Sequence, residues 1–170
     1  MSKLTVEFIE QSIYRIKENS LKINTCLQEL SVNEVWSRSN ECSNSIANLI
    51  LHLCGNIRQY IISSLGKQED LRERNIEFST TEGFTIEELK EKLNSTISEA
   101  VEIISGLNEE SLLAVRSVQG FALSGIGIII HVVEHYSYHT GQIIAFTKQI
   151  KNNQFDFYAE HDLNQKNKIS

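Results

Sequence analysis

Proline is absent from the 170-residue sequence, and only eight residues are glycine. Proline breaks a helix from within and glycine weakens it, so long helices can form here without interruption. The three cysteines, Cys26, Cys42 and Cys54, are odd in number and lack a C-x-x-C spacing, which favours reduced thiols over a disulfide framework. The scarcity of helix breakers therefore favours an all-α fold.

Long apolar runs are also missing. The longest, "IGIIIHVV", contains a histidine and falls far short of the roughly 20 apolar residues that a membrane-spanning helix needs. The opening "MSKLTVEFIEQSIYRIKENS" alternates charged and apolar residues and lacks the features of a signal peptide. We expect a cytoplasmic protein without a membrane span.

No excess of positive charge points to nucleic acid. Sixteen Lys and Arg stand against twenty-two Asp and Glu, for a formal charge of −6, and both signs are scattered along the chain. Proteins that bind the phosphate backbone need clustered basic residues. We therefore expect no nucleic-acid partner.

Apolar residues recur with helical periodicity in four segments, which predict a four-helix bundle. Capping boxes are expected at Ser31 with Glu34 and at Thr85 with Glu88. Residues 67–82 show little periodicity and predict an exposed connection, and 107–124 predict a short strand or irregular crossing around Val115 to Phe121. We expect one domain over residues 1–163 and a flexible tail over 164–170. The predicted helices cover residues 4–29, 43–66, 85–106 and 125–149.

The segment "HVVEHYSYHTGQI" places His131, His135 and His139 on one helical stripe. Residues four apart on a helix lie roughly 6 Å from each other and can chelate one ion, whereas residues eight apart lie about 12 Å apart and cannot. Two pairs are therefore possible, and His135 belongs to both. The first pair also fits the H-x-x-E-H pattern of inverted zinc proteases, with Glu134 as base, but such short patterns arise easily by chance.

A third ligand is available in His52, the remaining histidine within a predicted helix. Asn48, Asn56 and Gln59 share its polar strip, and antiparallel packing of the second and fourth helices would bring this strip opposite the histidine stripe. The alternative is that these histidines are surface or hydrogen-bonded residues without a metal. Three imidazoles around one ion would leave a position open, as catalytic sites do.

The segments "NSIANLILHLCGNIRQYI" and "HVVEHYSYHTGQI" together resemble the DinB superfamily of bacterial four-helix-bundle proteins, also called DinB/YfiT-like metal-dependent enzymes. Their HLxGN and HxxxHxGQ elements occur in the order and spacing of that family. The resemblance covers nearly the whole chain, up to "FYAEHDLN". Many relatives carry a basic residue immediately before the GQ, where this sequence has Thr140, so a substrate analogy that depends on that residue does not carry over.

The resemblance implies a metal triad of His52, His135 and His139, bound to zinc or nickel in a homodimer. His131 would then be a pocket or second-shell residue. Some relatives transfer low-molecular-weight thiols such as bacillithiol to electrophiles, others use mycothiol or glutathione, and one branch consists of hydrolases. The resemblance thus implies a metal-dependent thiol transferase or hydrolase acting on a small molecule, the alternative being a non-enzymatic, stress-associated metal-binding dimer.

Each of these reactions has candidate residues in the sequence. For hydrolysis, the neighbours of the triad are Glu134, Tyr136, Tyr138 and Gln142; Gln142 shares the strip of the metal pair and is the better pocket residue. For thiol transfer, the polar groups that could hold the head of the thiol are Asn48, Asn56, Arg58 and Gln59.

Overall fold

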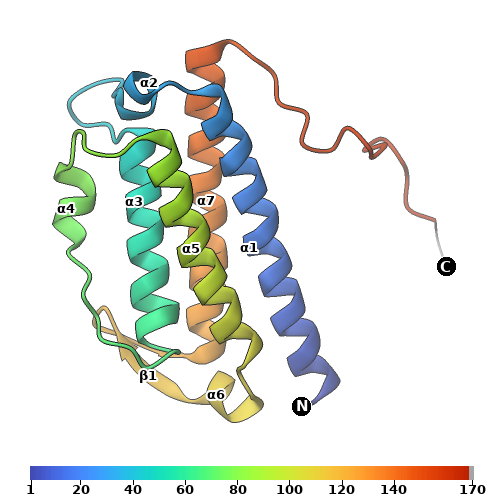
Figure 1. The fold of residues 1–170 in the computed structure, drawn as a ribbon. Coiled ribbons are helices and arrows are strands. Elements are labelled where there is room, and N and C mark those ends of the chain that lie inside the picture. Colours follow the sequence, from blue (N-terminus) through green and yellow to red (C-terminus); the bar gives the residue numbers. More distant parts are fainter. Residues whose placement is uncertain (169–170) are drawn as a thin grey trace.

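Four long helices form the bundle that the sequence predicts, in a computed structural model that describes residues 1–168 (Figure 1). α1 and α7 run in one direction along the bundle, whereas α3 and α5 run in the other. The antiparallel packing of α3 against α7 is thereby confirmed. The elements are α1 (Lys3–Glu29), α2 (Val32–Trp36), α3 (Ile46–Ile57), η1 (Arg58–Ser63), α4 (Arg74–Ser79), α5 (Ile86–Ser105), α6 (Glu109–Leu113), β1 (Val115–Val118), β2 (Phe121–Ser124) and α7 (Gly125–Lys151).

Side chains cap most of the helix starts, because the first amide groups of a helix have no partner within it. The capping boxes predicted at Ser31 and Thr85 are both present. Ser45 forms a third with Asn48, which fixes the start of α3. Ser124 caps α7 after the hairpin. These caps set where α3 and α7 begin and therefore which of their residues face each other.

The second predicted helix is interrupted near its end by η1, a π-helical turn that follows α3 directly. Three consecutive residues of this wider turn, Tyr60, Ile61 and Ile62, are buried. Tyr60 is thereby directed towards α7, where its ring stacks on that of His131.

A single apolar core lies between the four long helices. α1 packs against α5 and α7, and α3 packs against the same two helices. The three cysteines are free thiols, with Cys26 and Cys54 buried and Cys42 exposed. Residues from all four helices are fully buried in this core, among them Ile16, Ile23, Ile50, Leu53, Leu89, Leu93, Ile128 and Ile129.

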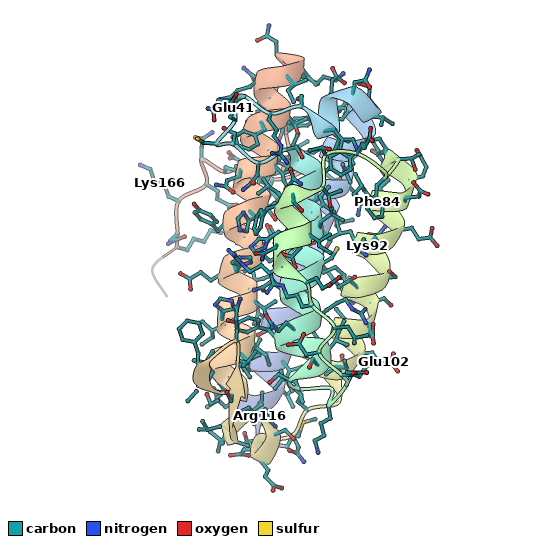
Figure 2. The ribbon with its side chains drawn as sticks, turned by 90° about the vertical axis from the view of Figure 1, so that its left-hand side faces the viewer. Glu41, Phe84, Lys92, Glu102, Arg116 and Lys166 are labelled. Carbon is teal, nitrogen blue, oxygen red and sulfur yellow. The ribbon has the colours of Figure 1, made fainter. Side chains whose placement is uncertain are left out.

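The connection over residues 67–82, here called the arm, departs from the sequence prediction of an exposed loop. Since α3 and α5 run in the same direction, the arm has to return along the whole bundle, and it carries α4 along the outer side of α3 (Figures 1 and 2). The prediction was wrong for Arg72 and Glu77, whose side chains are only 3% and 9% exposed. Their burial against α3 determines the surroundings of the candidate site.

The remaining segments lie at the ends of the bundle. The crossing expected around Val115 is a two-stranded antiparallel hairpin of β1 and β2, preceded by α6. Beyond Lys151 the described chain contains only turns and irregular structure, and residues 164–168 are exposed. The last two residues of the predicted tail, 169 and 170, lie outside the described part. Among residues 1–168 no helix has the length and apolar character of a membrane span.

Candidate metal centre

His52, His135 and His139 converge between α3 and α7. One ring nitrogen of each lies within 4.8 Å of those of the other two. The Nε2 atoms of His52 and His135 are 3.1 Å apart. His52 is 7% exposed, and the two histidines of α7 are partly buried. The antiparallel arrangement of the two helices thus brings together side chains that are far apart in the sequence.

His131 belongs to the same stripe but lies outside this cluster. Its ring stacks on Tyr60 at 4.2 Å between centroids and on His135 at 5.5 Å. Its Nε2 receives a hydrogen bond of 3.3 Å from the Asn56 amide. Among the two pairs that the spacing leaves open, the structure therefore groups His135 with His139. Glu134, the base of the protease interpretation, is exposed.

The Glu77 carboxylate orients the His52 ring. His52 donates from Nδ1 to Glu77 Oε2 over 2.8 Å. An ionised carboxylate only accepts hydrogen bonds, so the proton of the neutral ring lies on Nδ1 and the lone pair on Nε2 points into the cluster. A carboxylate behind a ligating histidine is the usual way to fix its tautomer and raise its basicity. Glu77 therefore prepares His52 to bind a cation.

Arg72 in turn holds Glu77. It donates from Nε to Oε1 over 2.7 Å and from Nη2 to Oε2 over 2.9 Å, so that the pair is bidentate. Burial alone would raise the pKa of Glu77, but the hydrogen bonds from Arg72 and His52 hold it below its usual value. Gln59 accepts a further hydrogen bond from Arg72 at 2.9 Å. The carboxylate thus stays ionised while nearly excluded from water.

The two α7 histidines have different surroundings. His139 donates from Nδ1 to Gln142 Oε1 over 2.7 Å, which leaves its Nε2 free to bind a cation. Gln142 also donates to the Tyr138 hydroxyl at 3.4 Å. In contrast, the Nδ1 atom of His135 is buried and has no hydrogen-bond partner among the described residues. Gln142 therefore contacts one histidine of the cluster.

Burial favours the neutral form of the three α7 histidines. Burial, together with the neighbouring His139, His52 and His131, lowers the pKa of His135 to about 3. Burial also lowers the pKa values of His131 and His139. Since a metal ion binds the neutral imidazole, no proton has to be removed from His135 or His139 near neutral pH.

The other predicted pocket residues have structural roles. Asn48 is fully buried, and its amide donates to the backbone oxygens of Glu77 and Thr80, which fastens the arm to α3. Asn56 is buried beside His131, and its Oδ1 has no partner among the described residues. Gln59 contacts Arg72 and Asp70 rather than the histidines. The polar groups proposed to hold the head of a thiol therefore do not line one pocket.

Two other sequence candidates lie away from the cluster. Tyr136 is buried on the side of α1, where its hydroxyl lies 2.9 Å from Ser20 Oγ. Arg58 is exposed and pairs with Glu99 of α5 at 3.3 Å. Neither side chain is in a position to contact a metal ion at the histidines.

The donor set fits a divalent metal ion. Two nitrogens at tetrahedral positions around zinc, with bonds of about 2.05 Å, lie roughly 3.3 Å apart, close to the separation of the His52 and His135 Nε2 atoms. Within residues 1–168 the ligand group comprises these three histidines alone. The three-histidine cluster can therefore hold a metal ion with a coordination position left over.

Glu77 and Arg72 are the residues that sequence reasoning missed. They lie in a polar stretch in which neither apolar periodicity nor a motif marks them. The available signal was the pair of apolar residues, Ile76 and Phe78, on either side of Glu77 in "RNIEFS". Phe78 is partly buried, and its ring centroid lies 4.7 Å from that of His52.

Comparisons with known proteins identify the family and the fold of the chain. Residues 3–159 match the model of the family DUF1572, described as proteins of unknown function. No curated protein matches the chain. The family match covers nearly the whole described chain, including all three histidines of the cluster.

Solved structures show the same fold. A DinB-like protein from Bacillus subtilis (YjoA) is 18% identical, with a TM-score of 0.68 over 87% of this chain and 96% of that one. A DinB-like protein from Bacillus cereus is 13% identical, with a TM-score of 0.67 over 84% and 92%. A conserved protein from Enterococcus faecalis is 14% identical, with a TM-score of 0.63 over 90% and 98%. The chain therefore belongs to the DUF1572 family and has the DinB-like four-helix fold.

Proposed function

We propose that this protein is a zinc- or nickel-dependent enzyme in which His52, His135 and His139 bind the metal ion, and that it transfers a small thiol, of the bacillithiol type, to an electrophile. The observation that carries the proposal is the convergence of three imidazoles without a fourth protein ligand among the described residues. Sites with three protein ligands and an open position are typical of catalysis, whereas structural sites are closed.

The surroundings of the cluster support transfer over hydrolysis. A metal ion alone can generate hydroxide, but metal-dependent hydrolysis commonly also uses a free base beside the attacking water. Glu77 is the carboxylate that contacts the cluster, but it is already bonded to His52 and Arg72. Glu134 is exposed and lies on another strip of α7. A thiol that binds to a metal loses its proton without such a base, so thiol transfer suits the residues that are present.

The metal ion and the side chains around it would contribute different parts of the reaction. A divalent ion held by these three imidazoles would supply an open position and would lower the pKa of a thiol that enters it. Glu77 and Gln142 keep the rings of His52 and His139 in place. In the transfer, the sulfur forms a bond with an electrophilic carbon, the leaving group departs with the electron pair of the broken bond, and the thiol proton passes to solvent.

Metal analysis and an activity assay together test the proposal. We expect one zinc or nickel ion per purified chain and conjugation of bacillithiol to a model electrophile such as monochlorobimane. His135→Ala should lose both the metal and the activity while its helical circular dichroism is kept. His131→Ala is the matched control from the same stripe and should keep the metal.

The possible outcomes separate the competing interpretations. A metal-loaded protein without turnover on any thiol tested would favour the non-enzymatic, stress-associated metal-binding role, in which metal removal lowers only the melting temperature. Retention of metal by His135→Ala would reject the three-histidine site itself. We also propose that the protein acts as a cytoplasmic homodimer, which sedimentation analysis tests.

A further inference from the structure

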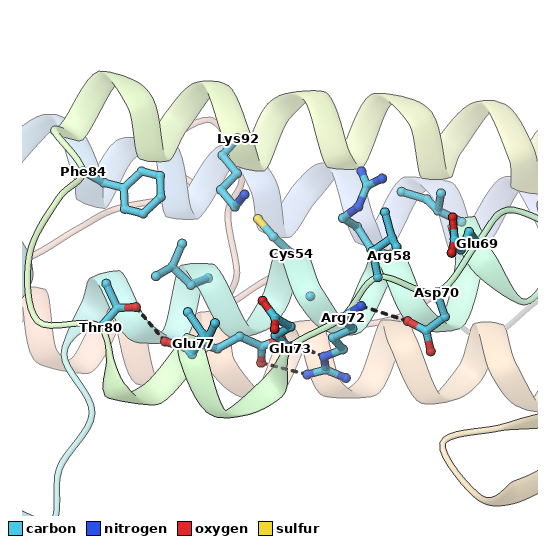
Figure 3. A pocket seen from close by; sticks show the side chains of 15 residues that line it. Cys54, Arg58, Glu69, Asp70, Arg72, Glu73, Glu77, Thr80, Phe84 and Lys92 are labelled. Atoms are coloured by element: carbon cyan, nitrogen blue, oxygen red, sulfur yellow. Dashed lines mark hydrogen bonds and ion pairs between the residues drawn. The ribbon is translucent and has the colours of Figure 1, made fainter.

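A cavity lies on the far side of the Glu77 and Arg72 pair, between the arm, α3 and α5. Its volume is about 240 Å³, and Figure 3 shows the side chains around it. Glu77 and Arg72 form part of its lining, so this one ion pair separates the cavity from His52. The cavity is distinct from the histidine cluster, which lies on the other side of the pair.

Apolar side chains from both sides line much of the cavity. Leu51 and Ile62 of α3 and η1 are buried beneath it, and Phe84 lies at one end. From the arm, Leu71 and Ile76 border the cavity, yet they remain 74% and 52% exposed. Ligand sites are typically concave and lined largely by apolar side chains with a few polar groups.

Besides Arg72, which pairs with Glu77, two cations border the cavity, Arg58 of η1 and Lys92 of α5. Arg58 is paired with Glu99, whereas Lys92 forms no ion pair within residues 1–168 and lies 5.9 Å from the centroid of the Phe84 ring. In Figure 3 the Lys92 side chain descends from α5 next to Cys54 and Phe84. The Lys92 ammonium group therefore lies at the apolar end of the cavity without an ion-pair partner among residues 1–168.

The acidic residues of the lining all belong to the arm. In Figure 3, Glu69 and Asp70 lie beside Arg58 at the end opposite Phe84, and Glu73 lies nearer the middle, whereas Glu77 is neutralised by Arg72. Cys54 contributes only an inert wall, because burial raises the pKa of its thiol to about 11. The charges therefore favour an anionic group at Lys92 and disfavour one at the Glu69 end.

We propose that this cavity binds a small amphiphilic anion, with its acidic head at Lys92 and its apolar body between Phe84 and Ile76. The volume is below the roughly 300–1,000 Å³ of pockets that hold drug-sized ligands, so the ligand is a short one, such as a medium-chain carboxylate. The proposal does not depend on the metal or on the proposed transfer reaction.

Titration of the full chain with octanoate tests the proposal, with binding followed by calorimetry and by ligand-observed NMR. We expect saturable binding of one octanoate per chain and no comparable binding of octylammonium. Lys92→Glu should weaken octanoate binding by about tenfold or more, because it places like charges together. Lys90→Glu makes the same charge change on α5 outside the cavity lining and should leave binding unchanged.

A second variant separates the cavity from other apolar surfaces. Ile76→Trp places a large ring at the cavity and should abolish octanoate binding without changing the helical spectrum, since Ile76 is half exposed. The proposal is overturned if octanoate does not bind the wild type, if octylammonium binds as tightly, if Lys90→Glu and Lys92→Glu behave alike, or if Ile76→Trp binds normally.

Discussion

Replacement of Glu77 by glutamine tests the central feature of the site, the carboxylate behind His52. Glutamine keeps the shape of the side chain but removes the charge that fixes the His52 tautomer. Loss of a carboxylate that accepts a hydrogen bond from a ligating histidine typically lowers metal affinity by about 10- to 100-fold, which corresponds to about 1.4 to 2.7 kcal/mol. We expect the zinc affinity of Glu77→Gln to fall within this range.

Stability has to be measured alongside affinity, because the same substitution leaves Arg72 without its partner. The Arg72 side chain is only 3% exposed, and an unpaired buried charge costs roughly 3 to 5 kcal/mol. The double variant Arg72→Met, Glu77→Gln removes that charge. It should recover most of the free energy of unfolding in urea titrations, yet its zinc affinity should stay low.

Competition titration of the chelator-treated protein with zinc measures the affinity. Glu73→Gln is the matched control, since Glu73 is an exposed carboxylate of the same arm and has no hydrogen bond to a histidine among the described contacts. If Glu77→Gln binds zinc as tightly as Glu73→Gln, or if the double variant recovers affinity together with stability, the carboxylate does not prepare His52 for the metal.

Three further substitutions or conditions probe the surroundings of the site. Gly55→Ala would place a Cβ against the Glu77 carboxylate, so we expect weaker zinc binding and a lower melting temperature, whereas Gly141→Ala, with nothing near its Cβ, should be neutral or slightly stabilising. In the metal-free protein, the pKa of His135 is near 6.5 in the unfolded chain but about 3 in the folded chain. The free energy of unfolding, measured by urea titration, should therefore fall as the pH drops through this interval. Tyr136→Phe removes a buried hydrogen bond to α1 and should cost about 0.5 to 1.5 kcal/mol without changing metal content; a loss of metal would place Tyr136 at the site after all.

The long helices could be predicted because their signals are local. Apolar residues at helical spacing, and caps such as Ser31 and Thr85, depend only on residues a few positions apart. The convergence of His52 with the α7 histidines needed one further assumption, antiparallel packing of two helices. That assumption holds because α3 and α7 run in opposite directions. Sequence spacing alone left open whether His131 or His139 pairs with His135.

The arm could not be predicted in the same way. Its direction follows from the parallel course of α3 and α5, which is a property of the whole bundle and not of residues 67–82. The burial of Arg72 and Glu77 is a consequence of that path, because two charged residues enter a core only when they pair with each other. The interruption of the second helix by η1 likewise depends on tertiary packing around Tyr60.

The short helix of the arm, α4, lies between the histidine cluster and the cavity, so its position affects both. α4 has six residues and no side-chain cap at its start, so its position depends on contacts with the rest of the chain, among them those of Arg38 and Asn48 with its backbone and those of Glu77 with α3. Detachment of the arm would move the Glu77 carboxylate away from His52 and would also open the cavity between the arm, α3 and α5. By reciprocity of linked equilibria, a molecule that holds the arm closed must tighten metal binding, and the metal must tighten binding of that molecule by the same factor.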